Sequence, residues 1–204
     1  MLNWFTSLRN RFRGTPPAAP VPAKPAEPVP PKDIYFVYRP LFNLLGKSEG
    51  TDKGDGYNET LGYGAYSGGD VRLITMSLAG VDALQTRMLA HPKNTLNSSA
   101  CGRYQVVRTT LRKVKKALEL PDTILFSEEC QDAICLHLLE GRGLSKYLAG
   151  TMKEDTFLLN LAKEWASIPT PEGKGYYGNQ SHTPVTPDQV RAVLAEVKAR
   201  YHKR

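Results

Sequence analysis

The sequence is poor in the residues that build disulfide frameworks and metal sites. Its 204 residues include three cysteines, an odd number, and four scattered histidines. Cys130 and Cys135 are separated by an awkward spacing for a disulfide on one helix, so we expect these two and Cys101 to be reduced packing residues. No CxxC or HExxH spacing occurs, and the sequence therefore predicts neither a metal site nor another cofactor.

Long apolar runs are also missing. No run approaches the roughly 18 residues that a membrane-spanning helix needs, so we expect no transmembrane helix. The N-terminus does not have the order of a secretory signal, because its basic residues follow its apolar ones and no apolar core segment comes after them. We therefore expect a protein that is made in the cytoplasm without a signal peptide and needs another route to any target outside.

Positive charge is in surplus, with a net charge of +7. A basic surface suits a polyanionic partner such as nucleic acid, an anionic membrane or a bacterial cell wall, and it is equally compatible with no such partner. The sequence shows no Arg/Lys stripe of the kind that nucleic-acid-binding proteins use, so we expect no nucleic-acid partner.

The first 33 residues differ in composition from the rest. Apolar residues near helical spacing alternate with arginines in residues 1–14, which predicts either an amphipathic segment for a membrane or partner groove, or a frayed basic tail. Residues 15–33 hold eight of the fifteen prolines and predict an extended linker with a reach of about 60 Å. Residues 34–204 have the composition of one globular domain. The hydrophobic content of the whole chain, 41%, is enough for such a domain to have a core.

Periodicity and end signals in residues 34–204 predict an α+β domain that is mainly α. Glycines, tyrosines and turn signals between residues 54 and 70 predict a small irregular hairpin. The first expected helix ends near Gly50, and the second spans residues 77–90. The third runs from Val107 to Leu118, and the fourth from a cap at Ser127 to the glycines at 141 and 143. The last two begin at an Asp155 cap and at Thr186.

Glu49 stands at the expected end of the first helix of the domain. A carboxylate there lies against the negative end of the helix dipole, and partial burial would further disfavour its ionisation. A raised carboxyl pKa is what a general acid needs to protonate a glycosidic oxygen near neutral pH. The position alone favours a surface residue before a turn.

Two further segments contain groups suited to a sugar ligand. Before one helix, Tyr104 has a ring that can stack on a sugar, and Gln105 has a donor and an acceptor; ordinary helix-start chemistry also explains them. After another helix, Tyr176 and Tyr177 lie in a glycine-rich loop that could line a cleft. Trp165, which precedes this loop, has the helical phase of a core residue.

Together these segments resemble the family of the phage lambda endolysin. The motifs that carry the resemblance, in order from about residue 40 to 180, are Ser48–Asp52 (SEGTD), Gly102–Gln105 (GRYQ), Ser127–Ala133 (SxxxQDA), Trp165–Pro169 (WASIP) and Gly175-Tyr176. Each motif is short, but five in this order make a specific signal.

The resemblance implies a lysozyme-like helical domain with a small β or loop region beside the cleft. It also implies a lytic transglycosylase that cleaves the MurNAc–GlcNAc β-1,4 bond of peptidoglycan and leaves a 1,6-anhydro end. Glu49 matches the family's single essential glutamate, which first donates a proton to the leaving oxygen and then accepts one from the C6 hydroxyl. The residues expected to contact the substrate are Thr51, Tyr63, Tyr104, Gln105 and one or both of Tyr176 and Tyr177.

Two features depart from this family: the longer stretch 54–99, with an extra expected helix, and the N-terminal segment with its proline-rich linker. The setting therefore stays open between a released endolysin, a virion-borne enzyme and a partner of a secretion machine. We expect a monomer that acts on the cell wall, with residues 1–14 docking it on a membrane or a protein partner.

Two alternatives use the same fold. A hydrolytic muramidase needs a second carboxylate, for which Asp52, Asp55, Glu59 and Asp70 are near enough in sequence, although none has a distinctive context. We interpret Asp52 as a residue that structures its loop. The other alternative is a non-catalytic module that binds the wall or builds the virion.

Overall fold

Seven α-helices form most of the regular structure in the part of the chain that the computed structural model describes, residues 33–178 and 183–203. From Ile34 on, the chain forms one compact unit. The predictions for residues 1–14 and for nearly all of the linker fall outside the described residues. The helices are α2 (Arg39–Ser48), α3 (Leu78–Ala90), α4 (Arg108–Ala117), α5 (Glu128–Gly141), α6 (Leu144–Leu148), α7 (Glu154–Glu164) and α8 (Pro187–His202).

The helix ends follow local capping chemistry. The side chains of Ser77 and Ser127 each accept a backbone N–H in the first turn of α3 and α5. Thr186 forms a complete capping box at the start of α8. The predicted cap at Asp155 is wrong, because α7 begins after Lys153 and Asp155 lies within its first turn. An acid there still interacts favourably with the helix dipole.

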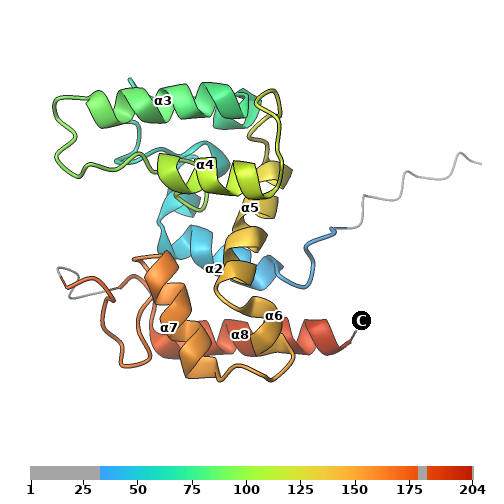
Figure 1. The fold of residues 1–204 in the computed structure, drawn as a ribbon. Helices are drawn as coiled ribbons and strands as arrows, with labels where there is room; N and C mark the ends of the chain where they lie inside the picture. The colour runs from blue at the N-terminus through green and yellow to red at the C-terminus, as the bar shows by residue number, and fades with distance from the viewer. Residues whose placement is uncertain (1–32, 179–182, 204) are drawn as a thin grey trace, which may run out of the picture. The chain divides into compact units, whose positions relative to one another are not determined.

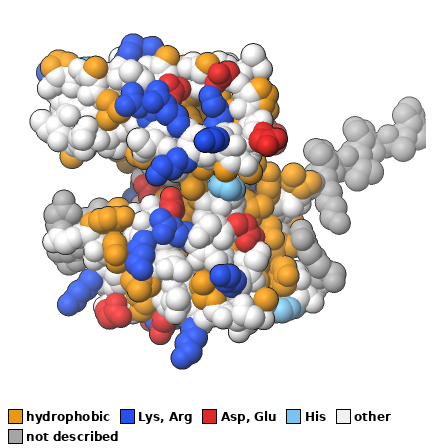
Figure 2. All heavy atoms as spheres, in the orientation of Figure 1, with side chains coloured by type: hydrophobic (Ala, Val, Ile, Leu, Met, Phe, Trp, Pro, Cys, Tyr) orange, Lys and Arg blue, Asp and Glu red, His pale blue; other side chains and the backbone are white. Residues whose placement is uncertain are grey.

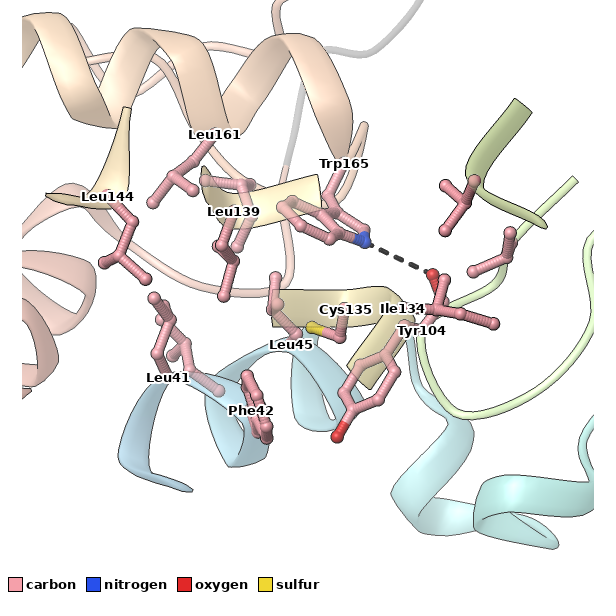
Figure 3. Close-up of a cluster of buried hydrophobic side chains, with 14 of the residues drawn as sticks. Leu41, Phe42, Leu45, Tyr104, Ile134, Cys135, Leu139, Leu144, Leu161 and Trp165 are labelled. Atoms are coloured by element: carbon pink, nitrogen blue, oxygen red, sulfur yellow. Dashed lines mark hydrogen bonds between the residues drawn. The ribbon is translucent and has the colours of Figure 1, made fainter. Parts of the chain in front are cut away.

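One apolar core joins the helices. Figure 3 shows the part of it where α2, α5, α6 and α7 meet, around Leu41, Leu45, Leu139 and Leu161. Trp165 is 4% exposed and donates its indole N–H to the Tyr104 carbonyl oxygen over 3.2 Å, which confirms it as a core residue. This tryptophan therefore fixes the loop after α7 against the segment before α4.

The helices form two parts with α2 and α5 between them (Figure 1). Helices α3 and α4 pack on each other in one part, and α6, α7 and α8 pack together in the other. Helix α5 contacts both α4 and α6, and α2 packs on α8. Figure 2 shows a hollow in the surface between the part with α3 and α4 and the part with α7 and α8.

The domain is mainly α as predicted, but the expected hairpin is wrong. Residues 54–70 form a short 3-10 helix, η2 (Gly56–Asn58), followed by a series of turns. Among the described residues, β pairing consists of isolated bridges, including Thr60 with Cys101 and Cys101 with Val106. Four glycines with positive φ between residues 62 and 69 turn the chain too often for a strand. The short helix α6 is a further element that periodicity did not predict.

Candidate active site

Glu49 caps the C-terminal end of α2, where the chain reverses into the short 3-10 helix η1 (Thr51–Lys53). Its backbone N–H donates to the Leu45 carbonyl oxygen over 2.8 Å. Gly50 follows with a φ of 78°, a conformation that favours glycine. A Cβ atom at Gly50 would lie 3.2 Å from the Tyr63 hydroxyl, so the turn 60–63 brings this exposed ring beside the corner that holds Glu49.

The Glu49 carboxyl is held by a serine from a distant segment. The Ser167 hydroxyl donates to Glu49 Oε1 over 2.5 Å. Ser167 Oγ also lies 2.9 Å from the hydroxyl of Ser48, which is buried in the last turn of α2. Ser167 belongs to the loop after α7, so two segments 118 positions apart in sequence meet at this carboxyl.

Burial raises the pKa of Glu49 above its ordinary value, and the hydrogen bond from Ser167 acts against this shift. The direction agrees with the sequence prediction, with desolvation as its main cause. A half-buried carboxyl with a raised pKa keeps its proton to higher pH than an exposed glutamate. A raised pKa is the direction of shift that a general acid needs.

The raised pKa of Glu49 has a consequence for folding stability. The folded protein holds the Glu49 proton more tightly than the unfolded chain does. The corresponding stabilisation is therefore complete below the unfolded pKa and is lost as pH rises through the folded pKa. Glu49→Gln has no proton to lose, so we expect it to gain stability relative to the parent protein as pH rises from about 4 to 8. Urea denaturation across this range measures the gain, and a difference independent of pH would contradict it.

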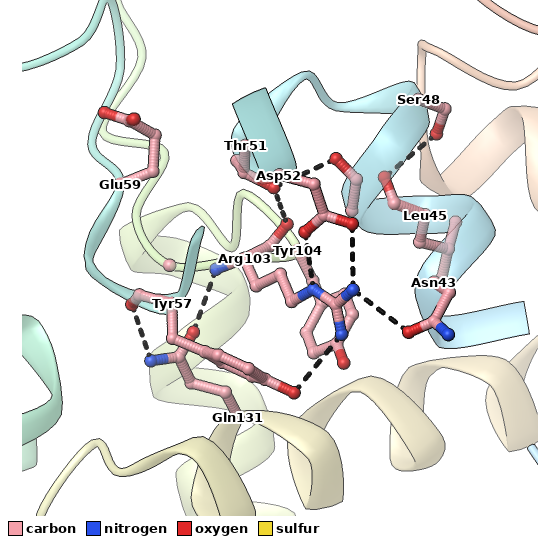
Figure 4. Close-up of polar contacts among 12 residues, drawn as sticks. Asn43, Leu45, Ser48, Thr51, Asp52, Tyr57, Glu59, Arg103, Tyr104 and Gln131 are labelled. Atoms are coloured by element: carbon pink, nitrogen blue, oxygen red, sulfur yellow. Dashed lines mark hydrogen bonds and ion pairs between the residues drawn. The ribbon is translucent and has the colours of Figure 1, made fainter. Parts of the chain in front are cut away.

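A clamp formed by Arg103 and Asp52 holds η1 against α2 (Figure 4). Arg103 donates to the two carboxylate oxygens of Asp52 over 2.8 and 2.9 Å, and to Asn43 Oδ1 over 3.0 Å. A Cβ at Gly46 would lie 2.5 Å from Asp52, so the clamp packs directly on the α2 backbone. This geometry confirms that Asp52 structures its loop.

Asp132 on α5 is the centre of a buried polar cluster. It accepts hydrogen bonds from the hydroxyls of Tyr104 (2.5 Å) and Tyr57 (2.8 Å), and from Arg39 (2.7 Å). Tyr104 is 1% exposed, and its ring packs edge-on against Phe42. The prediction that Tyr104 stacks on a sugar is therefore wrong, because burial and the hydrogen bond to Asp132 make it part of the scaffold.

Thr51 also belongs to the scaffold rather than to the substrate surface. It is 1% exposed, and its hydroxyl bonds to the carbonyl oxygens of Gly46 (3.1 Å) and Arg103 (2.8 Å). It therefore ties η1 both to α2 and to the segment before α4. The expectation that Thr51 contacts the substrate is corrected on this ground.

Replacing Thr51 with valine keeps the shape of the side chain and removes its hydroxyl. We expect a loss of about 1–2 kcal/mol in the free energy of unfolding, since the Gly46 and Arg103 carbonyl oxygens lose the one hydroxyl proton that they share. If Thr51 belongs only to the scaffold, the KM for the substrate should not change. Urea denaturation and steady-state kinetics measure the two effects, and Thr109→Val on the exposed side of α4 is the control. A raised KM at unchanged stability would restore the substrate-binding role.

Gly102 and Gln131, which belong to two different motifs, contact each other. A Cβ at Gly102 would lie 2.3 Å from Gln131 Oε1, so the glycine admits the Gln131 side chain, not a ligand. Gln131 accepts from the Arg103 N–H over 2.9 Å and donates to the Tyr57 and Phe126 carbonyl oxygens. The segment Ser127–Ala133 thus supports the loop that holds Arg103.

Besides Tyr63, three of the residues that were predicted to contact the substrate have accessible side chains. Gln105 is half-buried in a left-handed conformation (φ 50°), and its amide donates to the Gly102 carbonyl oxygen over 3.0 Å. Tyr176 and Tyr177 are 43% and 45% exposed and meet edge to face. Tyr177 donates to the Lys163 carbonyl oxygen over 2.8 Å. Both tyrosines follow the segment that supplies Ser167.

The four acids considered as a second catalytic carboxylate divide into two classes. Asp52 is engaged by Arg103, and Glu59 is buried, with its two carboxylate oxygens accepting the backbone N–H groups of Asp55 and Thr60. Asp55 and Asp70 are exposed. Asp52 and Glu59 therefore serve to shape the loop between α2 and α3, whereas the carboxylates of Asp55 and Asp70 are accessible.

The described residues show no cluster of three His, Cys, Asp or Glu side chains that could hold a metal ion. Within the same residues, no helix is both long and apolar enough to cross a membrane. All three cysteines are free thiols, and Cys101 and Cys135 are buried, which confirms their packing role. Burial raises the pKa of the Cys101 thiol to about 12.

Sequence reasoning missed Ser48, Ser167, Arg103 and Asp132 as parts of the site. Each lies inside one of the recognised motifs, so the motifs contained the signal. The roles depend on contacts between segments far apart in the chain, which the motifs alone do not reveal.

Residues 39–194 match a family model described as Endolysin. The matched range starts at the first residue of α2 and includes Glu49, the Ser167 loop, and Tyr176 and Tyr177. No curated protein and no solved structure matches the chain.

Proposed function

The chain belongs to the endolysin family, and from this premise we propose that it is a lytic transglycosylase that cleaves the MurNAc–GlcNAc β-1,4 bonds of peptidoglycan. Membership in the family makes the protein a phage enzyme that degrades the cell wall, with peptidoglycan as its substrate. It also confirms the resemblance carried by the five motifs. The type of bond and the chemistry are our proposal.

The observation that carries this proposal is a single half-buried carboxyl at the end of α2. The pKa of Glu49 is raised by burial, and its nearest acidic neighbour in sequence, Asp52, is bound to Arg103. A hydrolase of this kind generally uses two carboxylates on opposite sides of the scissile bond. A transglycosylase needs one acid, and two of the four candidates for a second carboxylate, Asp52 and Glu59, are engaged in contacts that shape their loop.

Glu49 would act twice in the reaction. Its carboxyl donates a proton to the glycosidic oxygen, and the bond from that oxygen to C1 of MurNAc breaks. The C6 hydroxyl of the same sugar attacks C1, and the Glu49 carboxylate takes the hydroxyl proton. The products are a strand ending in a new hydroxyl and a strand ending in 1,6-anhydro-MurNAc. No water is consumed, and Glu49 regains its proton.

The type of bond can be tested on purified peptidoglycan sacculi. Cleavage of glycan strands should release soluble muropeptides without new free amino groups, whereas cleavage of stem peptides or their amide links would create such groups. We expect release without amino groups from the parent protein and no release from Glu49→Gln. New amino groups would overturn the glycan-cleaving proposal, and no release by the parent protein would favour a non-catalytic module.

We propose that Gln105, Tyr63, Tyr176 and Tyr177 contact the glycan. Tyr63 is 64% exposed beside the corner that holds Glu49, so Tyr63→Ala should leave stability unchanged. Loss of an aromatic contact should raise the KM for soluble glycan fragments about two- to tenfold. Tyr201→Ala, an exposed tyrosine on α8, is the control. Equal KM values for the two variants would exclude Tyr63 from the substrate site.

A further inference from the structure

We propose that Ser167, supported by Ser48, is a positioning residue that holds one oxygen of the Glu49 carboxyl and leaves the other to exchange protons with the substrate. This inference rests on the proposed function. The geometry that supports it is a line of oxygen atoms in which Ser167 Oγ lies 2.5 Å from Glu49 Oε1 and 2.9 Å from Ser48 Oγ. Among the described residues, Ser167 is the side chain that bonds to this carboxyl.

Ser167 is fixed in place by its neighbours in the loop after α7. Trp165 is anchored by its indole N–H on the Tyr104 carbonyl oxygen, and its backbone N–H donates to Leu161. Ile168 is fully buried and donates its N–H to the Trp165 carbonyl oxygen over 3.0 Å. A hydroxyl between two buried anchors keeps its position when the substrate binds. The loop therefore presents Ser167 to Glu49 as a rigid donor.

When Glu49 is ionised, the two hydroxyl protons of Ser167 and Ser48 determine which group donates in each hydrogen bond. Each serine hydroxyl has one proton, and the carboxylate has none. If Ser167 donates to Glu49, the short contact with Ser48 is satisfied only when Ser48 donates to Ser167. The Leu45 carbonyl oxygen, 3.1 Å from Ser48 Oγ, loses little, because it still accepts the Glu49 backbone N–H. Ser48 thus strengthens the donor that faces the carboxylate.

This arrangement suits a group that must release a proton and then take one back. Burial favours the protonated carboxyl before the first step, and Ser167 stabilises the carboxylate that exists between the two steps. Titratable groups on the segments that meet at Glu49 include Lys47 on α2, the Asp52–Arg103 pair, Tyr63, and Lys163 and Glu164 at the end of α7. None of them contributes to the shift in the Glu49 pKa, which comes from burial and Ser167. The loop 165–169 itself has no charged residue.

The test compares Ser167→Ala with Ser167→Thr, which keeps a hydroxyl, and with Ser48→Ala. Ser145→Ala, an exposed serine on α6, is the control. Carbon NMR of the labelled Glu49 carboxyl gives its pKa without any need for activity, and kcat and KM are measured against pH. We expect Ser167→Ala to raise the Glu49 pKa, to lower kcat about ten- to a hundredfold and to leave KM within about twofold. The basic limb of the pH profile should move upward with the pKa.

Ser48→Ala should give a smaller shift in the same direction, and Ser167→Thr should restore much of kcat. If Ser167→Ala fails to fold, the Glu49 pKa is titrated in Ser48→Ala and Ser167→Thr instead. An unmoved pKa in Ser48→Ala would then count against the positioning role. An unmoved Glu49 pKa, or a kcat loss with an unmoved pH profile, would overturn the positioning role. If the pKa moves but the parent protein cleaves no glycan, the proposed function fails while the role of Ser167 toward the carboxyl stands.

Discussion

Glu49→Gln should reduce the lysis of purified peptidoglycan by at least about a hundredfold, the lower range of what general acid–base catalysis contributes. The amide is close in shape to the carboxyl and can still accept the hydrogen bond from Ser167. It has no acidic proton for the glycosidic oxygen and cannot take one from the C6 hydroxyl. Both proton transfers that we assign to Glu49 are therefore lost in one substitution. Release of soluble muropeptides per unit time measures the effect.

Glu128→Gln is the matched control for this experiment, because Glu128 is an exposed acid in the first turn of α5. It should retain the activity of the parent protein. Thermal unfolding verifies that Glu49→Gln is folded, and the pH-dependent stability gain expected for this variant gives a second check. Activity of Glu49→Gln within about tenfold of the parent would remove Glu49 from the chemistry.

Asp132→Ala should lower the free energy of unfolding by about 3 kcal/mol or more. The substitution removes the acceptor of two tyrosine hydroxyls, one of them on the buried Tyr104, and also one bond from Arg39. Leaving buried polar groups without a charged partner lowers the free energy of unfolding by about this amount. For a domain of this size the melting temperature should fall by about 6 to 12 °C.

Asp188→Ala is the control for Asp132→Ala, since the Asp188 side chain is 96% exposed at the start of α8. It should change stability by less than about 1 kcal/mol. Asp132→Asn keeps an acceptor and should fall between the two. If Asp132→Ala unfolds at the same temperature as the control, the cluster around Asp132 contributes little and Tyr104 is held by packing alone.

The helical framework could be predicted because its signals are local. Ser127 caps its helix as predicted, and Ser77 and Thr186 cap the helices that were expected to begin at these residues. Each cap depends on a backbone group within three residues. Asp155 shows the limit of this reasoning, because an acid inside the first turn and an acid at the cap have similar contexts. The hairpin prediction failed because turn signals alone do not show whether the chain between them pairs.

The candidate site was predicted less completely than the fold. Helix-end position and the surrounding motif pointed to Glu49, and both are readable along the chain. Ser167 contributes through contacts with Glu49, from which it is separated by most of the domain. Tyr104 was misassigned because a motif names residues but does not say which side of the backbone faces the core. Its burial follows from Asp132 and Phe42, which lie in other segments.

The corrected assignments change the meaning of the motifs. Arg103, Gln131 and Asp132 are all scaffold residues that hold the end of α2, the loop after it and the segment before α4 together. The groups that we propose for the substrate are Glu49 and the accessible side chains of Tyr63, Gln105, Tyr176 and Tyr177. In physical terms, most of the residues in these motifs fix the segments around the end of α2 against one another.

The central claim is that Glu49 cleaves the glycan without water. Digestion of purified sacculi in ¹⁸O-labelled water, followed by mass spectrometry of the released muropeptides, tests it directly. We predict MurNAc ends in the 1,6-anhydro form, lighter than reducing ends by the mass of one water and free of ¹⁸O. Reducing MurNAc ends that contain ¹⁸O would show hydrolysis and contradict the account.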